Sequence, residues 1–226
     1  MSLYILNIET ATTNCSVSLS KDGNTIVLKE DNDKSYSHAE RLHVYIDTVL
    51  KEANITSADI KAIAISKGPG SYTGLRIGVS AAKGLCFALD KPLISISTLE
   101  ALAHQVICDD GVIVAMLDAR RMEVYSAIFD SNHNQIRETQ AQILEENTFS
   151  DYLELGKVYF IGNGVEKTKD LIQHPNAIFI EDKLPSANEM GLLANNKYKK
   201  SDTEDVAYFE PYYLKDFVAL KPKPKS

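Results

Sequence analysis

The chain has 226 residues, of which 44% are apolar, and a net charge of −7. This is enough material for one large or two small globular domains, and the negative charge argues against unaided binding of a nucleic-acid backbone. No apolar run is long enough to span a bilayer and no signal-like segment starts the chain, so we expect a cytoplasmic protein without a membrane partner. The three cysteines show no paired spacing, which favours small buried thiols in a reducing compartment.

The same order of predicted elements occurs twice along the chain. The first set has strands at 3–8, 15–20 and 25–29, a helix at 38–53, a strand at 60–66, a helix at 71–89, a strand at 92–96 and a helix near 98–107. The second has strands at 112–117, 122–129 and 135–143, a helix near 148–155, a strand at 157–161, a helix after Gly164, a strand at 176–180 and a helix near 186–199. The repeat predicts two similar α/β lobes, residues 1–108 and 109–226, each with a mixed five-stranded sheet.

Three local patterns support this division of the chain. Asp22-Gly23 predicts a hairpin turn between the second and third strands. Ser37, with Glu40 three residues later, predicts a capping box at the start of the first helix. A Lys-Pro alternation ends the chain and predicts an exposed basic tail on the second lobe.

The segment Lys67–Leu85 joins a strand to a helix through a glycine-proline turn. Glycines at such a junction let backbone amides approach an anion near the positive end of the helix dipole. On this interpretation the candidate nucleotide or anion contacts are Glu9, Thr10, Gly70 and Ser71. The alternative is a tight turn into a closely packed helix. The spacing fits neither a P-loop nor a dinucleotide fingerprint.

Small residues recur along one face of the helix after this turn. Gly74, Gly78 and Ala82 are spaced by four residues. Each helical glycine costs about 1 kcal/mol relative to alanine, a cost that makes sense where another backbone must approach. We therefore expect a docking surface first and an anion site second.

Two acidic residues occupy matching places in the repeat. Glu9 and Asp118 end the first strand of each set, where a hydrolytic metal site would require carboxylates. A polar residue that simply ends a strand fits the pattern equally well. His38 and His43 lie five residues apart, which is a poor spacing for a metal pair on a helix, and we predict no metal site.

Five segments occur in order along the chain: Ile5–Thr12 continuing through Cys15–Val17, His38–Leu42, Gly68–Gly78, Leu117–Tyr125 and Pro211–Lys215. Together they resemble the TsaB (YeaZ) family of bacterial tRNA threonylcarbamoyladenosine biosynthesis proteins, from the first strand to near the C-terminus. The resemblance implies a duplicated fold of the actin, sugar-kinase and Hsp70 type, which is ribonuclease H-like.

The resemblance also implies a noncatalytic subunit of the enzyme that places a threonylcarbamoyl group on N6 of adenosine 37 in tRNAs reading ANN codons. In the larger catalytic relative, TsaD, two metal-binding histidines lie four residues apart. Thr98 and Leu102 occupy the corresponding positions here, and leucine cannot ligate a metal. The implied chain has no catalytic residue and no intrinsic cofactor, and ATP or ADP would bind at the interface of a complex.

The implied partners are TsaD, the small P-loop ATPase TsaE, a second copy of this chain when TsaD is absent, and tRNA reached through the complex with weak or no direct binding. The resemblance places the TsaD interface on the helices at 38–53 and 71–89. The candidate interface residues are Leu42, Tyr45, Gly70, Ser71, Tyr72, Thr73, Gly74, Arg76, Gly78 and Ala82. On this expectation, Gly78→Leu abolishes partner binding and leaves the monomer folded.

Three other functions remain open from the sequence. An active small-molecule kinase of the same fold would need glycine-flanked acidic loops after Glu9 and Asp118, and the glycines are missing there. A peptidase would need a catalytic triad or a zinc motif, and the spacing supports neither. A self-associating scaffold with no remaining role in tRNA modification would keep the helical surface but would not bind TsaD.

Overall fold

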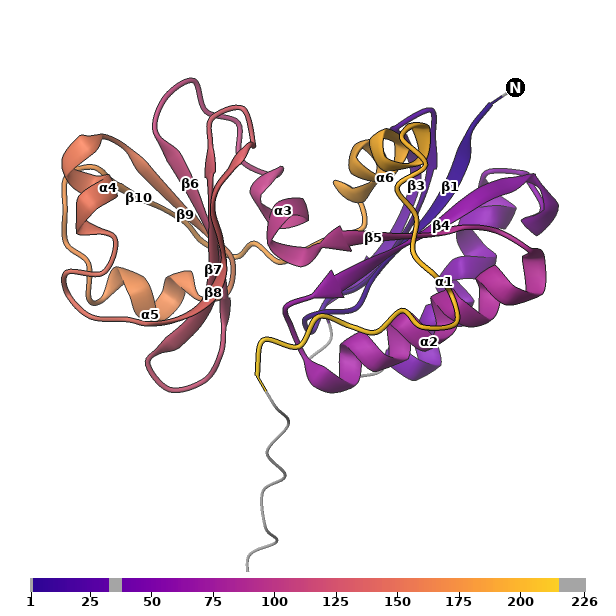
Figure 1. Cartoon of the computed structure of the whole chain (residues 1–226), viewed down its shortest axis with the longest axis horizontal. Coiled ribbons are helices and arrows are strands. Elements are labelled where there is room, and N and C mark those ends of the chain that lie inside the picture. The colour runs from indigo at the N-terminus through magenta and orange to yellow at the C-terminus, as the bar shows by residue number, and fades with distance from the viewer. Residues whose placement is uncertain (1, 33–37, 216–226) are drawn as a thin grey trace, which may run out of the picture.

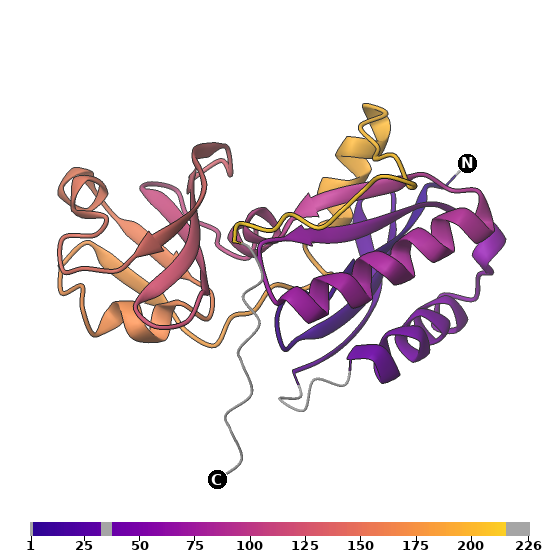
Figure 2. The same cartoon turned by 60° about the horizontal axis from the view of Figure 1, so that its bottom comes forward.

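The computed structural model describes residues 2–32 and 38–215, which form two lobes side by side (Figures 1 and 2). The strand order is β3-β2-β1-β4-β5 in the first sheet and β10-β9-β6-β7-β8 in the second. In each sheet the first three strands along the chain are antiparallel neighbours, and the last two run parallel to the first. The duplicated α/β fold predicted from element order is therefore confirmed.

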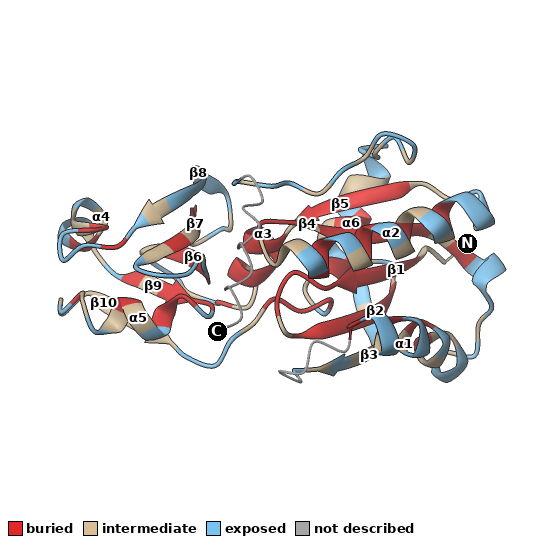
Figure 3. Cartoon of the chain, turned by 90° about the horizontal axis from the view of Figure 1, so that it is seen from below, coloured by how far each residue is buried: buried red, intermediate tan, exposed pale blue. Residues whose placement is uncertain are grey.

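The first sheet contains β1 (Tyr4–Glu9), β2 (Cys15–Lys21), β3 (Asn24–Asp31), β4 (Ile60–Gly68) and β5 (Leu93–Ser97). Its central strands are apolar and buried on both faces because helices cover the sheet from both sides (Figure 3). Asp22 and Gly23 have φ angles of 53° and 93°, which confirms the predicted hairpin turn.

Two helices cover one face of the first sheet: α1 (His38–Glu52) and α2 (Tyr72–Leu89). A single 3-10 turn, η1 (Ser57–Asp59), precedes β4. Leu42, Ile46 and Val49 recur at helical spacing and bury the inner side of α1. Ser37, the predicted cap of this helix, lies outside the described residues.

The second lobe contains the strands β6 (Val112–Asp118), β7 (Glu123–Asp130), β8 (Gln135–Ile143), β9 (Val158–Ile161) and β10 (Ala177–Ile180). One face of its sheet is covered by α3 (Thr98–Ala103), which joins the lobes. The other face is covered by α4 (Ser150–Leu155) and α5 (Val165–Lys169). The helices predicted near 98–107 and 148–155 are shorter in the structure.

The end of the chain returns to the first lobe, and the predicted second domain at 109–226 is wrong in this respect. The last helix, α6 (Met190–Lys199), packs on the face of the first sheet opposite α1 and α2 (Figure 1). Residues 200–215 then follow β5 and α2, with hydrogen bonds from Glu204 N to Leu93 O (2.8 Å) and from Tyr212 N to Lys67 O (2.7 Å). The physical reason is that the sheet face beneath α6 is apolar and would otherwise be exposed.

Candidate functional site

The glycine face of α2 packs against the turn that follows β1. A Cβ atom on Gly74 would overlap the Thr10 carbonyl oxygen, and one on Gly78 would overlap Thr10 Oγ1. A Cβ on Gly70 would overlap the Ala11 carbonyl oxygen, which accepts a hydrogen bond from Ser71 N at 2.6 Å. The close backbone approach that the glycines predict is confirmed, and the approaching backbone belongs to this chain.

Four of the predicted interface residues are therefore inside the molecule. Gly74, Gly78 and Ala82 are buried, so the expectation that they form a docking stripe is wrong, and the candidate interface residue Leu42 is buried as well. The expectation that Gly78→Leu leaves the monomer folded is wrong for the same reason, because the new side chain would collide with Thr10.

The residues predicted to bind an anion form hydrogen bonds within the chain instead. Thr10 Oγ1 donates to Gly74 O at 2.8 Å, and Ser71 Oγ accepts from Gly74 N at 3.3 Å, as an N-cap does. Glu9 is fully buried, with Oε1 accepting from Ala11 N at 2.5 Å. The prediction of an open anion site at this turn is contradicted, because these groups satisfy one another.

Burial gives Glu9 an unusual protonation equilibrium. Its Oε2 has no hydrogen-bond partner in the described part of the chain. Burial raises the pKa of Glu9 to about 7, and hydrogen bonds from Ser66, Ala11 and Thr10 offset part of the rise. The carboxyl at the end of β1 therefore keeps its proton to a higher pH than an exposed glutamate does, and it is inaccessible to a ligand.

Asp118 ends β6 as Glu9 ends β1, and the two positions match in the sheet topology. Their surroundings differ, because Asp118 is exposed and accepts from Lys167 Nζ at 2.6 Å. Within residues 2–32 and 38–215, no group of three histidine, cysteine or acidic side chains is placed to hold a metal ion.

The exposed face of α2 carries a second set of small residues. Thr73, Ser80, Gly84 and Ala88 are exposed, and a Cβ on Gly84 would meet open space. Phe87 lies on the same side and is 87% exposed. This outward face runs beside α1, whose Val44 is 59% exposed (Figure 3).

Aromatic side chains gather at the N-terminal end of this face. Arg76 is exposed, and its Nη1 donates to Tyr72 Oη at 2.9 Å. The Tyr72 ring lies 5.1 Å from the Tyr213 ring of the returning C-terminal segment. Tyr45 on α1 is half-buried against the core. Of the predicted interface residues, Thr73 and Arg76 are exposed, and Tyr45, Gly70, Ser71 and Tyr72 are half-buried.

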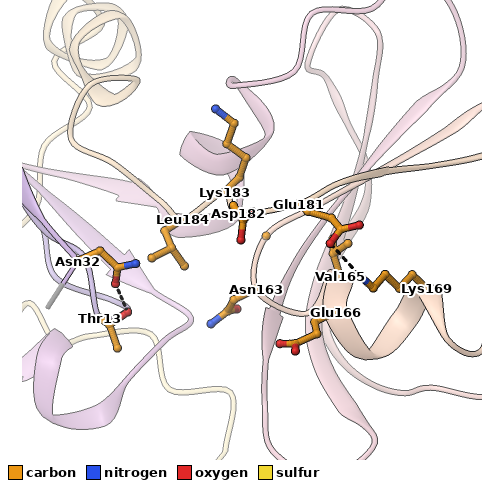
Figure 4. A pocket seen from close by; sticks show the side chains of 11 residues that line it. Thr13, Asn32, Asn163, Val165, Glu166, Lys169, Glu181, Asp182, Lys183 and Leu184 are labelled. Carbon is orange, nitrogen blue, oxygen red and sulfur yellow. Dashed lines mark hydrogen bonds and ion pairs between the residues drawn. The ribbon is translucent and has the colours of Figure 1, made fainter. Parts of the chain in front are cut away.

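A cavity of about 530 Å³ lies between the lobes (Figure 4). Its lining includes Thr13 and Asn32 from the first lobe, Asn163 and Lys169 from the second, and the connecting segment at 181–184. Thr13 Oγ1 donates to Asn32 at 2.6 Å, and Lys169 pairs with Glu181 at 2.7 Å. None of the sequence-predicted site residues lines this cavity, since its walls come from several distant segments that no local pattern brings together.

Comparison with known proteins assigns the chain to a family. Residues 32–223 match the family model described as TsaD, tRNA N6-adenosine threonylcarbamoyltransferase. The tRNA threonylcarbamoyladenosine biosynthesis protein TsaB of Escherichia coli K12 is 32% identical, over 98% of this chain and 99% of its own length. The chain belongs to the TsaB family. Bacillus subtilis TsaB is 29% identical over 88% of this chain and 85% of its own length.

The solved structures agree with this family assignment. YeaZ from Pseudomonas aeruginosa superposes with a TM-score of 0.80 at 26% identity, covering 94% of this chain and 100% of its own. Ethanolamine utilization protein EutJ from Carboxydothermus hydrogenoformans shares the fold alone, with a TM-score of 0.51 at 10% identity, over 85% of this chain and 90% of its own. In the described part of the chain, no helix is long and apolar enough to cross a membrane.

The two faces of α2 predict opposite effects of the same substitution. Gly74→Ala should lower the free energy of unfolding by about 3 kcal/mol, because the new methyl group meets the Thr10 backbone. Gly84→Ala should raise it by up to about 1 kcal/mol, because the methyl group enters open space and alanine favours the helix. Urea denaturation of both variants measures the difference, and equal effects would contradict this packing.

The raised pKa of Glu9 predicts that the free energy of unfolding depends on pH. Since its folded pKa of about 7 lies above the ordinary glutamate pKa of 4.5, its contribution to stability is fully present below pH 4.5 and is lost as the pH rises through 7. The total loss is on the order of 3 kcal/mol. Denaturation of the native protein and of Glu9→Gln between pH 4.5 and 8 isolates this group. Their difference in unfolding free energy should change across this window, and a constant difference would refute the shifted pKa.

Proposed function

We propose that this protein acts in threonylcarbamoyladenosine biosynthesis on tRNA as a noncatalytic subunit that docks onto a TsaD protein. The observation that carries this proposal is the exposed face of α2, with its small side chains and the exposed ring of Phe87. A helix costs stability when it keeps a glycine at an open position such as Gly84. Close approach of a helix from another molecule would explain the glycine, because a larger side chain at this position would keep the two helices apart.

The partner surface follows from the family relationship. The TsaD family model matches residues 32–223, a range that includes α1 and α2, so a TsaD protein is expected to carry an equivalent pair of helices. Two such pairs pack face to face, with Phe87 and Val44 as apolar anchors and the residues around Gly84 allowing close contact. The same arrangement accommodates a homodimer when TsaD is absent.

Several features support a noncatalytic role. The acid at the end of β1, Glu9, is sealed inside the first lobe. Thr98 and Leu102, which the family resemblance assigns to the positions of the metal-binding histidines of TsaD, are both buried, and Thr98 Oγ1 lies 2.6 Å from Ser66 Oγ. In the cavity between the lobes, Lys169 is neutralised by Glu181. The chemistry is accordingly assigned to TsaD.

We extend the proposal to further partners because of the resemblance to the TsaB family. TsaE would join the complex, and ATP or ADP would bind at its interfaces rather than in this chain alone. Arg76, held by Tyr72 at the end of the exposed α2 face, would face a partner carboxylate or a nucleotide phosphate. The tRNA would be reached through the complex, since a chain of net charge −7 has little intrinsic attraction for its backbone.

Substitutions at Gly84 test the docking surface. Gly84→Leu should weaken TsaD binding about tenfold or more, because a bulky side chain prevents close helix approach. Gly84→Ala is the matched control, with the same gain in helix propensity and little added volume. Calorimetric titration of TsaD measures both affinities, and circular dichroism checks that both variants are folded.

Undiminished TsaD binding by Gly84→Leu would remove this face from the interface. Sedimentation of the protein alone distinguishes the scaffold alternative. If the native chain self-associates through this face and binds no TsaD, it is a self-associating scaffold.

A further inference from the structure

Arg137 is a half-buried residue of β8, the edge strand of the second sheet. Its Nη2 donates to Ser126 Oγ at 2.7 Å, and its central carbon lies 5.1 Å from the centroid of the Phe149 ring. Its Nε is buried and has no hydrogen-bond partner among the described residues. Arg137 also forms no ion pair with any residue in the described ranges. A partly desolvated cation that forms no ion pair is costly to keep.

A cavity of about 130 Å³ opens beside this guanidinium, where α4 begins. Its lining is formed by Arg137, Asn147, Phe149, Ser150, Asp151 and Tyr152. The side chains of Asn147, Ser150 and Tyr152 make no hydrogen bond within the part of the chain that the structure describes. Four side chains with free donor groups therefore surround one small space.

Phe149 forms a fixed support for the guanidinium. Its backbone is left-handed, with a φ of 69°, which is strained for a bulky residue. Its ring packs edge-on against Phe160 in the core of the second lobe, with 5.6 Å between the centroids. Thr148 Oγ1 accepts from Glu145 N at 2.7 Å and closes the turn that presents the ring. The cavity is thus preorganised by a strand and a separate turn.

The size and chemistry of the cavity restrict its occupant. Its volume is below the roughly 300–1,000 Å³ of pockets that enclose whole metabolites. It has room for one compact group, and a guanidinium flanked by hydroxyl and amide donors matches the oxygens of a phosphate. The exposed carboxylate of Asp151 also lines the cavity and opposes an anion, although it forms no ion pair with Arg137.

We propose that this cavity binds a phosphate group, either free phosphate or the phosphate of a larger molecule that remains outside. Arg137 provides the charge, and Asn147 and Ser150 provide hydrogen bonds. The site lies on the second lobe, whereas the proposed TsaD interface lies on α1 and α2 of the first. Failure of either proposal therefore leaves the other standing.

A phosphate titration at constant ionic strength tests the site directly. The arginine Nε–H signals in a nitrogen–proton NMR spectrum report on the side chain itself. With inorganic phosphate at millimolar concentrations, the Arg137 signal should shift and saturate, while the signal of exposed Arg121 should not. A linear, unsaturated shift at both arginines would overturn the proposal, because it would indicate nonspecific anion effects alone.

Three variants distinguish specific phosphate binding at this cavity from a general stabilisation of the protein by salt. Arg137→Gln should lose the rise in melting temperature that phosphate gives the native protein, and Ser150→Ala should weaken binding several-fold without removing the cation. Asp151→Asn should tighten binding, since it removes the opposing charge. An equal rise in all variants and the native protein would contradict the site. Should Arg137→Gln fail to fold, the other two variants and the NMR titration still decide.

A final comparison identifies the source of the phosphate. Unmodified tRNA replaces inorganic phosphate in the same NMR titration of the native protein. If tRNA shifts the Arg137 signal, the phosphate belongs to RNA. If only inorganic phosphate does so, the site binds the free ion. Absence of a saturable shift with both ligands refutes the proposal.

Discussion

The contact between α2 and the Thr10 backbone fixes the rest of the first lobe. Gly70, Gly74 and Gly78 bring the helix so close to the turn after β1 that no Cβ atom fits between them. The same contact seals Glu9 beneath the turn and leaves no room for an anion at the helix N-terminus. Because the helix is held rigidly on one side, its opposite side is presented in a defined orientation.

This packing gives α2 two faces with different roles. The inner glycines are needed for this packing, since larger residues at Gly70 and Gly74 would collide with backbone carbonyl oxygens and one at Gly78 would collide with Thr10 Oγ1. On the outer side, a Cβ atom on Gly84 would meet open space, so packing within this chain does not require a glycine there. The returning segment at 200–215 braces α2 from the side, with Lys83 Nζ donating to Phe209 O at 2.8 Å. The outer face of α2 therefore belongs to a helix that is braced on two sides.

The sequence was sufficient to predict the order of strands and helices and the duplication, because strand runs, the Asp22-Gly23 turn and the periodicity of α1 are local signals. It could not predict which side of α2 faces inward, since both sides carry small residues at helical spacing. The sequence also could not predict where α6 packs. Its short apolar stripe could cover either sheet, and only the structure shows that the face of the first sheet opposite α1 and α2 needs a cover. The burial of Glu9 and the isolation of Arg137 depend on segments far apart in the chain.

The proposed subunit is required for the reaction and inert alone, and reconstitution of tRNA modification tests this most directly. The mixture contains TsaD, TsaE, the enzyme that forms threonylcarbamoyl-adenylate, ATP, threonine, bicarbonate and unmodified tRNA, with or without this protein. We expect that modification requires the protein, and that the protein alone neither hydrolyses ATP nor modifies tRNA. Equal modification without it, or ATP hydrolysis by the protein alone, would contradict the noncatalytic role.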